Sequence, residues 1–302
     1  MQDIWQISSL SQDDLILHIL PGIGGRLWDI TYKQQSLLFQ NNDLVGHQPD
    51  LSSLENLPTR SPQFAFPLWG GEKTWIAPDS LWPDGGPYPV LDSGSYEIVF
   101  QDEQQITIQS QICNISQLQI ERSIKLGDDA RITISHKVTN HGLEDRMAGI
   151  WSVLMLDHPT QIGVVSGPQT VTPIFGKPDG HYRVADSKLI CVCETLAEFK
   201  IGADNPNGRV VLKLGEKNNP IWMACLTKPP SPHATFAHDH SLEIFNSGDY
   251  QYCEAEWHAP AKMLKPNEST MFEQTFIPWS GEQIPDKLKL TPQEMELMSC
   301  MS

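Results

Sequence analysis

Residues 105–140 read QITIQSQICNISQLQIERSIKLGDDARITISHKVTN, and this stretch decides the fold class. Apolar side chains recur at every second position in three runs, which is the period of a β-strand with one buried face. The segments NIS and GDD separate the runs and have the composition of hairpin connections. The stretch therefore predicts three consecutive antiparallel strands. The apolar positions are Ile106, Ile108 and Ile112, then Leu118, Ile120, Ile124 and Leu126, then Ala130, Ile132, Ile134 and Val138.

The same alternation continues along the chain and predicts an all-β, antiparallel fold. Two segments do not alternate, 41–92 and 157–187, and we expect them to be long irregular loops that wall a site, because long loops in compact domains are usually functional. The sequence TPQEMELM after Leu290 predicts a short capped turn within a tail of about 282–302, and one domain over 1–302 is expected. The further expected strands are 148–156, 189–194, 197–202, 209–214, 221–227, 242–246, 250–258 and 270–277.

Composition and charge exclude several classes of function. The 302 residues carry 37 Asp and Glu against 21 Lys and Arg, a net charge of −16, which repels phosphate backbones and anionic lipid. We therefore expect no nucleic-acid and no membrane partner, and no window approaches the roughly 20 apolar residues of a membrane-spanning helix. The start MQDIWQISSLSQDD lacks the pattern of a secretory signal. The six cysteines include no CxxC pair, so we expect reduced thiols and a cytoplasmic protein.

The segment YCEAEWHAP, residues 252–260, is the strongest candidate for chemistry. Alternation places Glu254, Glu256 and His258 on one face of a strand. Two carboxyl groups about 7 Å apart disfavour joint ionisation when buried, which raises one pKa toward the range useful for proton transfer. The alternative is that this is the exposed polar face of an ordinary sandwich strand.

Two other polar residues fall in phase with apolar neighbours, Arg122 and His136. A polar group on an apolar face needs a partner or a task. In one interpretation Arg122 pairs with a buried carboxylate and His136 is a core histidine with its hydrogen bonds made. In the other, this face lines a cleft in which Arg122 holds a substrate oxygen.

A metal site formed by histidines must also be considered. His238 and His240 stand at i and i+2, which directs both side chains to one face of a strand, and they could meet Glu254 or His258 across a hairpin. The spacing is not diagnostic, and a solvated pair of loop histidines explains it as well. We therefore expect no metal and no cofactor.

Four stretches together resemble the galactose mutarotase-like proteins, which are related to aldose 1-epimerases, and in particular a branch with a WGG(D/E)KTW segment. The resemblance covers most of the chain. It implies a β-supersandwich whose concave face binds a sugar, with a glutamate as general base at the anomeric hydroxyl and a histidine as general acid at the ring oxygen. The stretches are PGIGGRLWDITYKQQSLLFQN (21–41), FPLWGGEKTW (66–75), ISHKVTNHG (134–142) and CEAEWHAPAKMLKPNEST (253–270).

This sequence departs from the family pattern at both histidines. Trp69 stands where the family has the histidine of a Leu-His-Gly-Gly stretch, and Trp151 stands at the position after the Thr-Asn strand. An indole N–H donates a hydrogen bond but does not exchange a proton with a ring oxygen. Either the acid role has passed to another group, or the cleft binds without turnover.

Lys73 is a candidate for that acid, because a desolvated lysine near Arg122 would have a lowered pKa. The alternative is that Glu72 and Lys73 form a surface ion pair. Tryptophans at 69, 75, 82 and 151 suit a sugar site, because the apolar face of a pyranose packs on a flat ring, although tryptophan also fills sandwich cores.

The first hypothesis is an isomerase-like enzyme that acts on an aldose or sugar derivative by acid–base catalysis. A carbohydrate-binding or sensor protein without catalysis is the second, and a scaffold recruited to a biosynthetic isomerisation or cyclisation is the third. We expect a small-molecule carbohydrate as partner and a monomer or homodimer. In the first hypothesis Glu254 or Glu256 is the base, Lys73, His136 or His258 is the acid, and Arg26, Trp69, Glu72, Trp75, Arg122 and Trp151 contact the substrate.

Overall fold

The computed structural model describes residues 3–127, 129–165, 171–215, 219–281 and 284–301. Within these residues the chain forms two large antiparallel sheets. The first sheet runs in the order β1 (Ser8–Gln12), β2 (Leu15–Leu20), β3 (Arg26–Tyr32), β5 (Glu72–Ala77), β10 (Arg146–Asp157), β19 (Tyr252–His258), β18 (Leu242–Asn246), β15 (Phe199–Ala203) and β12 (Thr172–Gly176). Two short strands extend it: β4 (Gln35–Ser36) pairs with β3, and β20 (Lys262–Leu264) pairs with β10.

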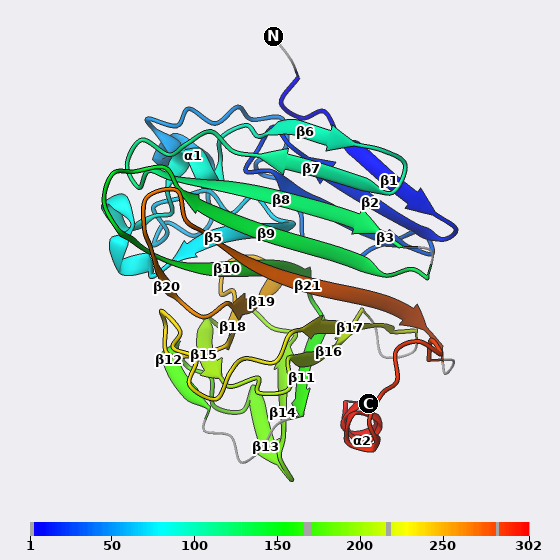
Figure 1. Cartoon of the computed structure of the whole chain (residues 1–302). Helices are drawn as coiled ribbons and strands as arrows, with labels where there is room; N and C mark the ends of the chain where they lie inside the picture. The colour runs from blue at the N-terminus through cyan, green and yellow to red at the C-terminus, as the bar shows by residue number, and fades with distance from the viewer. Residues whose placement is uncertain (1–2, 128, 166–170, 216–218, 282–283, 302) are drawn as a thin grey trace.

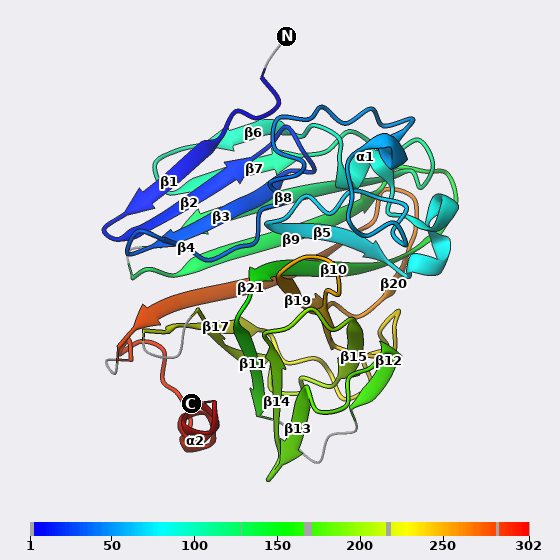
Figure 2. The same ribbon diagram turned by 180° about the vertical axis from the view of Figure 1, so that it is seen from behind.

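The second sheet has ten strands, and its middle is the long strand β21. Figures 1 and 2 show β21 and β10 crossing the middle of the molecule, with β1 to β9 on one side and β11 to β17 on the other. The order is β13 (Tyr182–Ala185), β14 (Lys188–Cys193), β11 (Thr160–Val165), β16 (Arg209–Leu214), β17 (Ile221–Thr227), β21 (Ser269–Ser280), β9 (Ile132–Asn140), β8 (Leu118–Leu126), β7 (Gln105–Gln109) and β6 (Glu97–Gln101).

The largest cluster of buried apolar side chains takes residues from both sheets. In the central strands of the first sheet, alternate residues belong to this core and to a second, aromatic cluster. Ile76 and Ile150 lie in the main core, whereas their neighbours Trp75 and Trp151 lie in the aromatic cluster. Since successive side chains of a strand point to opposite faces, the aromatic cluster covers the face of the first sheet that is turned away from the core.

The all-β, antiparallel prediction is confirmed. The three runs of residues 105–140 form β7, β8 and β9, except that Ile112 lies after β7 and is exposed and Ala130 lies before β9. The other predicted strands are also present, with ends that differ by a few residues; for example, the strand expected over 250–258 begins at Tyr252.

The loop predictions need two corrections. Residues 72–77 form β5, a central strand with both faces buried, so its side chains do not alternate between apolar and polar. The segment 157–187 contains β11, β12 and β13, and residues 166–170 of it lie outside the described residues. Much of 41–92 is irregular, with the short helices η1 (Leu54–Asn56), η2 (Asp79–Leu81), η3 (Pro83–Gly85) and α1 (Pro89–Asp92).

The predicted capped turn is the helix α2 (Pro292–Cys300). Thr291 accepts a hydrogen bond from the backbone of Glu294, and the Glu294 side chain accepts one from the backbone of Thr291, which makes a capping box. Leu297 of the helix belongs to an apolar cluster with residues of the second sheet. Among the described residues, no helix is long and apolar enough to cross a membrane.

Candidate functional site

The first sheet carries a pocket of about 340 Å³ on its aromatic face, and we call it the aromatic pocket. The volume lies within the usual range of small-molecule sites. Its walls come from β5, β10, β12, β15, β18 and β19 and from the segments that flank β5. Eight lining side chains are aromatic: Phe64, Phe66, Trp75, Trp82, Trp151, Phe175, Phe245 and Tyr252. The polar lining side chains are Asp79, Ser80, Lys200 and Glu254.

Strand register brings these residues together from distant parts of the chain. In β10, Val153 pairs with Lys73 of β5 and with Glu256 of β19, and Trp151 pairs with Trp75. Residues that pair directly across antiparallel strands share one face of the sheet. The face of β5, β10 and β19 that carries the tryptophans therefore also carries the lysine and the glutamates.

Three tryptophans form a rigid floor in the aromatic pocket. The rings of Trp82 and Trp151 stack with centroids 5.4 Å apart. The Trp75 ring meets both edge-on, with its centroid 5.2 Å from that of Trp82 and 4.9 Å from that of Trp151. Each indole N–H is held: Trp75 donates to Asp92 and Trp82 to the Ile76 carbonyl, both at 2.7 Å, and Trp151 donates to Glu256 at 2.8 Å. Fixed aromatic rings of this kind suit the apolar face of a sugar ring.

Glu254 is the buried carboxylate among the lining residues of the pocket. Its Oε1 lies 3.2 Å from Nζ of Lys73, and both side chains are buried. The Lys73 ammonium also lies 4.1 Å from the ring centroid of Trp75. Burial lowers the pKa of Lys73, and the attraction to Glu254 opposes this shift. Lys73 thus holds Glu254 in place from behind the pocket wall.

Tyr252 lines the pocket and carries a buried hydroxyl. Among the described residues, this hydroxyl has no hydrogen-bond partner. Burial raises the pKa of Tyr252 well above its usual value, so the hydroxyl stays protonated at neutral pH. A buried hydroxyl without a partner is costly, and a polar ligand atom would relieve that cost.

A second ionic group lies beside the tryptophans. The Lys200 ammonium is 2.7 Å from Glu243 and 2.9 Å from Glu256, and it lies 4.7 Å from the ring centroid of Trp151. Burial alone would lower the pKa of Lys200, but the two carboxylates outweigh it and raise that pKa. Burial, together with the nearby Glu254 and Glu243 charges, raises the pKa of Glu256. Glu256 is thus engaged by Lys200 and Trp151, whereas Glu254 lines the pocket.

His258 lies next to this group and outside the lining of the aromatic pocket. Its ring stacks on Trp151 at 5.2 Å, and its Nε2 lies 3.4 Å from Oε2 of Glu243. Burial lowers the pKa of His258 to about 4. The two loop histidines separate: His238 contacts His258, with ring centroids 4.8 Å apart, whereas His240 packs over Gly202.

Arg122 and His136 follow the first of the two interpretations, a buried ion pair and a core histidine, and Glu72 lies in the core with them. Arg122 and Glu72 form a fully buried ion pair between β8 and β5, which belong to different sheets. His136 is also fully buried, with Nδ1 2.7 Å from the Thr74 hydroxyl and Nε2 3.1 Å from the Gln274 amide oxygen. None of the three lines the aromatic pocket, because they lie on the strand faces that meet in the core.

Arg26 and Trp69 also lie away from the aromatic pocket. The Arg26 guanidinium is 2.8 Å from the Asp92 carboxylate, and both side chains are buried. Trp69 is buried in a small cluster with Trp28, and its indole N–H donates to Ser93 at 3.0 Å. Gly70 and Gly71 turn the chain sharply here, both with positive φ, so Trp69 and Trp75 occupy different clusters.

Sequence reasoning missed several polar residues at the site, among them Lys200, Glu243 and Tyr252. Two of them leave a signal in hindsight, since Lys200 interrupts the apolar run FKIGA and Glu243 stands between Leu242 and Ile244. A buried charge inside an apolar strand needs a partner. Tyr252 leaves no such signal, because a tyrosine is common in any strand.

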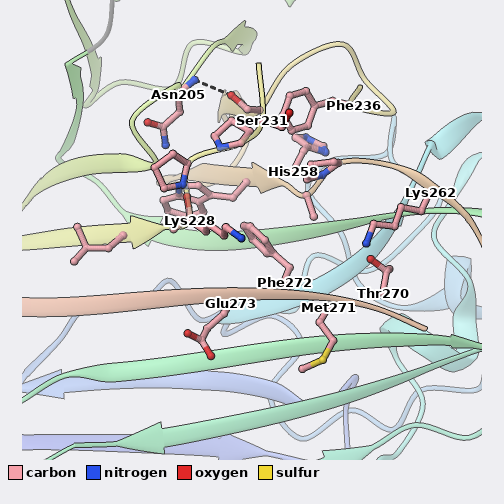
Figure 3. Close-up of a pocket in the computed structure, with 18 of the residues that line it drawn as sticks. Asn205, Lys228, Ser231, Phe236, His258, Lys262, Thr270, Met271, Phe272 and Glu273 are labelled. Carbon is pink, nitrogen blue, oxygen red and sulfur yellow. Dashed lines mark hydrogen bonds between the residues drawn. The ribbon is translucent and has the colours of Figure 1, made fainter. Parts of the chain in front are cut away.

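A larger cavity of about 740 Å³ lies beside the end of β19 and shares no lining residue with the aromatic pocket. Figure 3 shows His258 on its wall, near Phe236 of the loop before β18, and Phe272 of β21 nearby. Lys228 and Lys262 also line it. We call it the larger cavity.

Comparison with solved structures identifies the fold. The Slr1438 protein from Synechocystis sp. PCC 6803 is similar over 91% of this chain and 96% of its own, with 12% identity and a TM-score of 0.60. A galactose mutarotase-like protein from Lactobacillus casei ATCC 334 is similar over 91% of this chain and 100% of its own, with 8% identity and a TM-score of 0.55. This chain has the galactose mutarotase-like fold.

A galactose mutarotase related enzyme from Lactobacillus acidophilus shares the galactose mutarotase-like fold over 91% of this chain and 97% of its own, at 8% identity and a TM-score of 0.55. No family model and no curated protein matches the sequence. The predicted β-supersandwich is thereby confirmed as a fold. One fold hosts many chemistries, so function must be argued from the site.

Proposed function

We propose that the aromatic pocket binds a monosaccharide in its pyranose form and that Glu254 acts on it as a general base, in a reaction of the aldose 1-epimerase type. The observation that carries the proposal is the place of Glu254, a carboxylate in a pocket wall beside the stacked rings of Trp82 and Trp151. The similarity to a protein described as a galactose mutarotase related enzyme supports it.

The lining of the pocket fits a sugar in both its apolar and its polar parts. The face of a pyranose that carries C–H groups packs on Trp82 and Trp151, and its hydroxyl groups meet Tyr252 and Glu254 at the edge. The hydroxyl of Tyr252, which has no partner among the described residues, donates a hydrogen bond to a sugar oxygen. The pocket thus offers one apolar surface and a few polar contacts.

In the proposed reaction, Glu254 takes the proton of the anomeric hydroxyl while the bond between C1 and the ring oxygen breaks. The ring oxygen takes a proton from water, and the open-chain aldehyde turns about the C1–C2 bond before the ring closes on the other face. Closure reverses the proton transfers, so Glu254 and water are regenerated. Lys73, 3.2 Å from Oε1 of Glu254, fixes the position of this carboxylate for the base role.

The test is anomer exchange followed by NMR across a panel of unphosphorylated hexoses and pentoses. We expect the wild type to exceed the uncatalysed rate and Glu254→Gln to lose that excess by 100-fold or more, the order of a general-base contribution. Glu97→Gln, which alters an exposed glutamate of β6, is the matched control and should keep the wild-type rate. Equal rates for Glu254→Gln and wild type would refute the base assignment.

A carbohydrate-binding protein without catalysis is the second candidate function. Among the described residues, no histidine lines the aromatic pocket, and this observation favours it. Calorimetry on the same panel separates the two candidates. Saturable binding that weakens in Trp82→Ala, together with exchange at the background rate, would identify a binding protein.

A further inference from the structure

Three potential metal ligands meet beside the aromatic pocket, and the proposed sugar chemistry uses none of them. His238 comes from the loop before β18, Glu243 from β18, and His258 from the end of β19. One ligand atom from each lies within 4.8 Å of the other two. Glu243 and His258 are buried, and His238 is half-buried.

Two of the spacings match those within a coordination sphere. Nδ1 of His238 is 3.4 Å from Oε1 of Glu243, and Nε2 of His258 is 3.4 Å from Oε2 of Glu243. These distances exceed those of an ordinary N–H···O hydrogen bond. Two ligand atoms that each lie about 2.1 Å from a tetrahedral zinc ion are about 3.4 Å apart.

His258 provides a second, independent observation. Its side chain is only 1% exposed, and among the described residues neither ring nitrogen has a hydrogen-bond partner. Buried imidazoles are usually satisfied at one nitrogen at least, since an unpaired buried polar atom is costly. An ion bound at Nε2 would satisfy this ring.

The surroundings can orient the other two ligands. Nδ1 of His238 faces Glu243, and its Nε2 accepts a hydrogen bond from the Asp79 amide at 3.3 Å and lies 3.5 Å from the Asp79 carboxylate. A histidine that binds a metal at Nδ1 carries its proton on Nε2, so in the metal-bound protein Nε2 would donate to the Asp79 carboxylate instead. The Lys200 ammonium lies 2.7 Å from Oε2 of Glu243, and Oε1 is the oxygen that faces His238. Glu256 lies 2.9 Å from the same ammonium.

We propose that His238, Glu243 and His258 bind a divalent first-row transition metal, with Zn²⁺ as its representative. Two imidazoles and one carboxylate form a zinc ligand set that leaves a fourth position open. His258 also lines the larger cavity, which gives an ion and its water a route to the cluster (Figure 3). The proposal is independent of the sugar chemistry, because Glu254 is not a ligand.

The experiment is equilibrium dialysis of chelator-treated full-length protein against Zn²⁺, with metal analysis, and a visible spectrum after Co²⁺ is added. We expect one Zn²⁺ per chain and d–d bands of four- or five-coordinate Co²⁺. The affinity should fall tenfold or more in His238→Ala and in Glu243→Gln. His233→Ala, which removes an exposed histidine of the same loop, should match wild type.

His238→Ala decides the outcome if the variants of the more buried residues fail to fold, because His238 is partly exposed. Circular dichroism establishes that each variant is folded before its affinity is compared. Zn²⁺ binding by folded His238→Ala at wild-type affinity would overturn the proposal. So would a wild type that binds less than one ion per chain at saturating Zn²⁺.

Discussion

The imidazole of His136 shows what a buried titratable side chain does in this fold when it has no catalytic task. It lies between the sheets, and its two ring nitrogens meet Thr74 and Gln274. Burial lowers its pKa from 6.5 to about 4. The folded protein therefore keeps this ring neutral at pH values where the unfolded chain would protonate it.

His136 should make the stability of the protein depend on pH. Between about pH 6.5 and pH 4 the unfolded chain binds one proton more than the folded chain at this site, so the free energy of unfolding falls as the pH falls. By pH 4, protonation of this group in the unfolded chain should lower the free energy of unfolding by about 3 kcal/mol. Urea unfolding of wild type and His136→Gln from pH 7 to pH 4 measures it, and we expect the variant to lose less stability over this range. Parallel curves for the two proteins would contradict the assignment.

Alternation predicted which side chains share a face of a strand, but not what that face meets in the folded protein. It placed Glu254, Glu256 and His258 on one face, and the structure agrees. For Arg122 and His136 it left two interpretations open, because a core and a cleft give the same local pattern. Only the position of the opposite sheet separates these interpretations, and no local sequence reports it.

At the scale of elements, β5 and β8 belong to different sheets and are joined by an ion pair. Arg122 of β8 pairs with Glu72 of β5 and also donates to the carbonyl of Gly25, all without solvent contact. Removing one partner of a buried pair leaves the other charge uncompensated. The two sheets are thus joined by the buried ion pair that sequence analysis gave as one of two interpretations of Arg122.

Breaking this pair should destabilise the protein strongly. We expect Arg122→Met to lower the free energy of unfolding by about 3–5 kcal/mol, and the double variant Arg122→Met, Glu72→Met to recover a large part of that loss. Lys137→Met is the matched control, because the pair of Lys137 with Glu121 is partly exposed and should be worth less than about 1 kcal/mol. Urea unfolding checks all three variants. A loss for Arg122→Met no larger than the control's would contradict this account.

The strand β5 also explains the main error at the element scale. Its sequence EKTWIA mixes charged, polar and aromatic residues, which favours a loop when read alone. The strand forms because each face meets a partner: Glu72 and Thr74 meet Arg122 and His136, and Trp75 joins the aromatic cluster. Such pairings depend on residues far away in the chain, so local patterns cannot predict them.

For the whole molecule, the galactose mutarotase-like fold places the main core and the aromatic pocket on opposite faces of the first sheet. The main core joins the two sheets, and the aromatic pocket lies on the other face of the first sheet. Its lining spans Phe64 to Glu254 in the sequence, and strand order alone brings these positions together. The fold class was predictable from alternation and family resemblance, but the lining residues from β12, β15 and β18 were not. One domain over 1–302 stays a prediction.

The most direct test of the central claim is a crystal structure from crystals soaked in a mixture of monosaccharides. The account predicts sugar density in the aromatic pocket, with the ring over Trp82 and Trp151 and one sugar oxygen within hydrogen-bond distance of Glu254. Sugar density in the larger cavity or elsewhere, with the aromatic pocket empty, would contradict it.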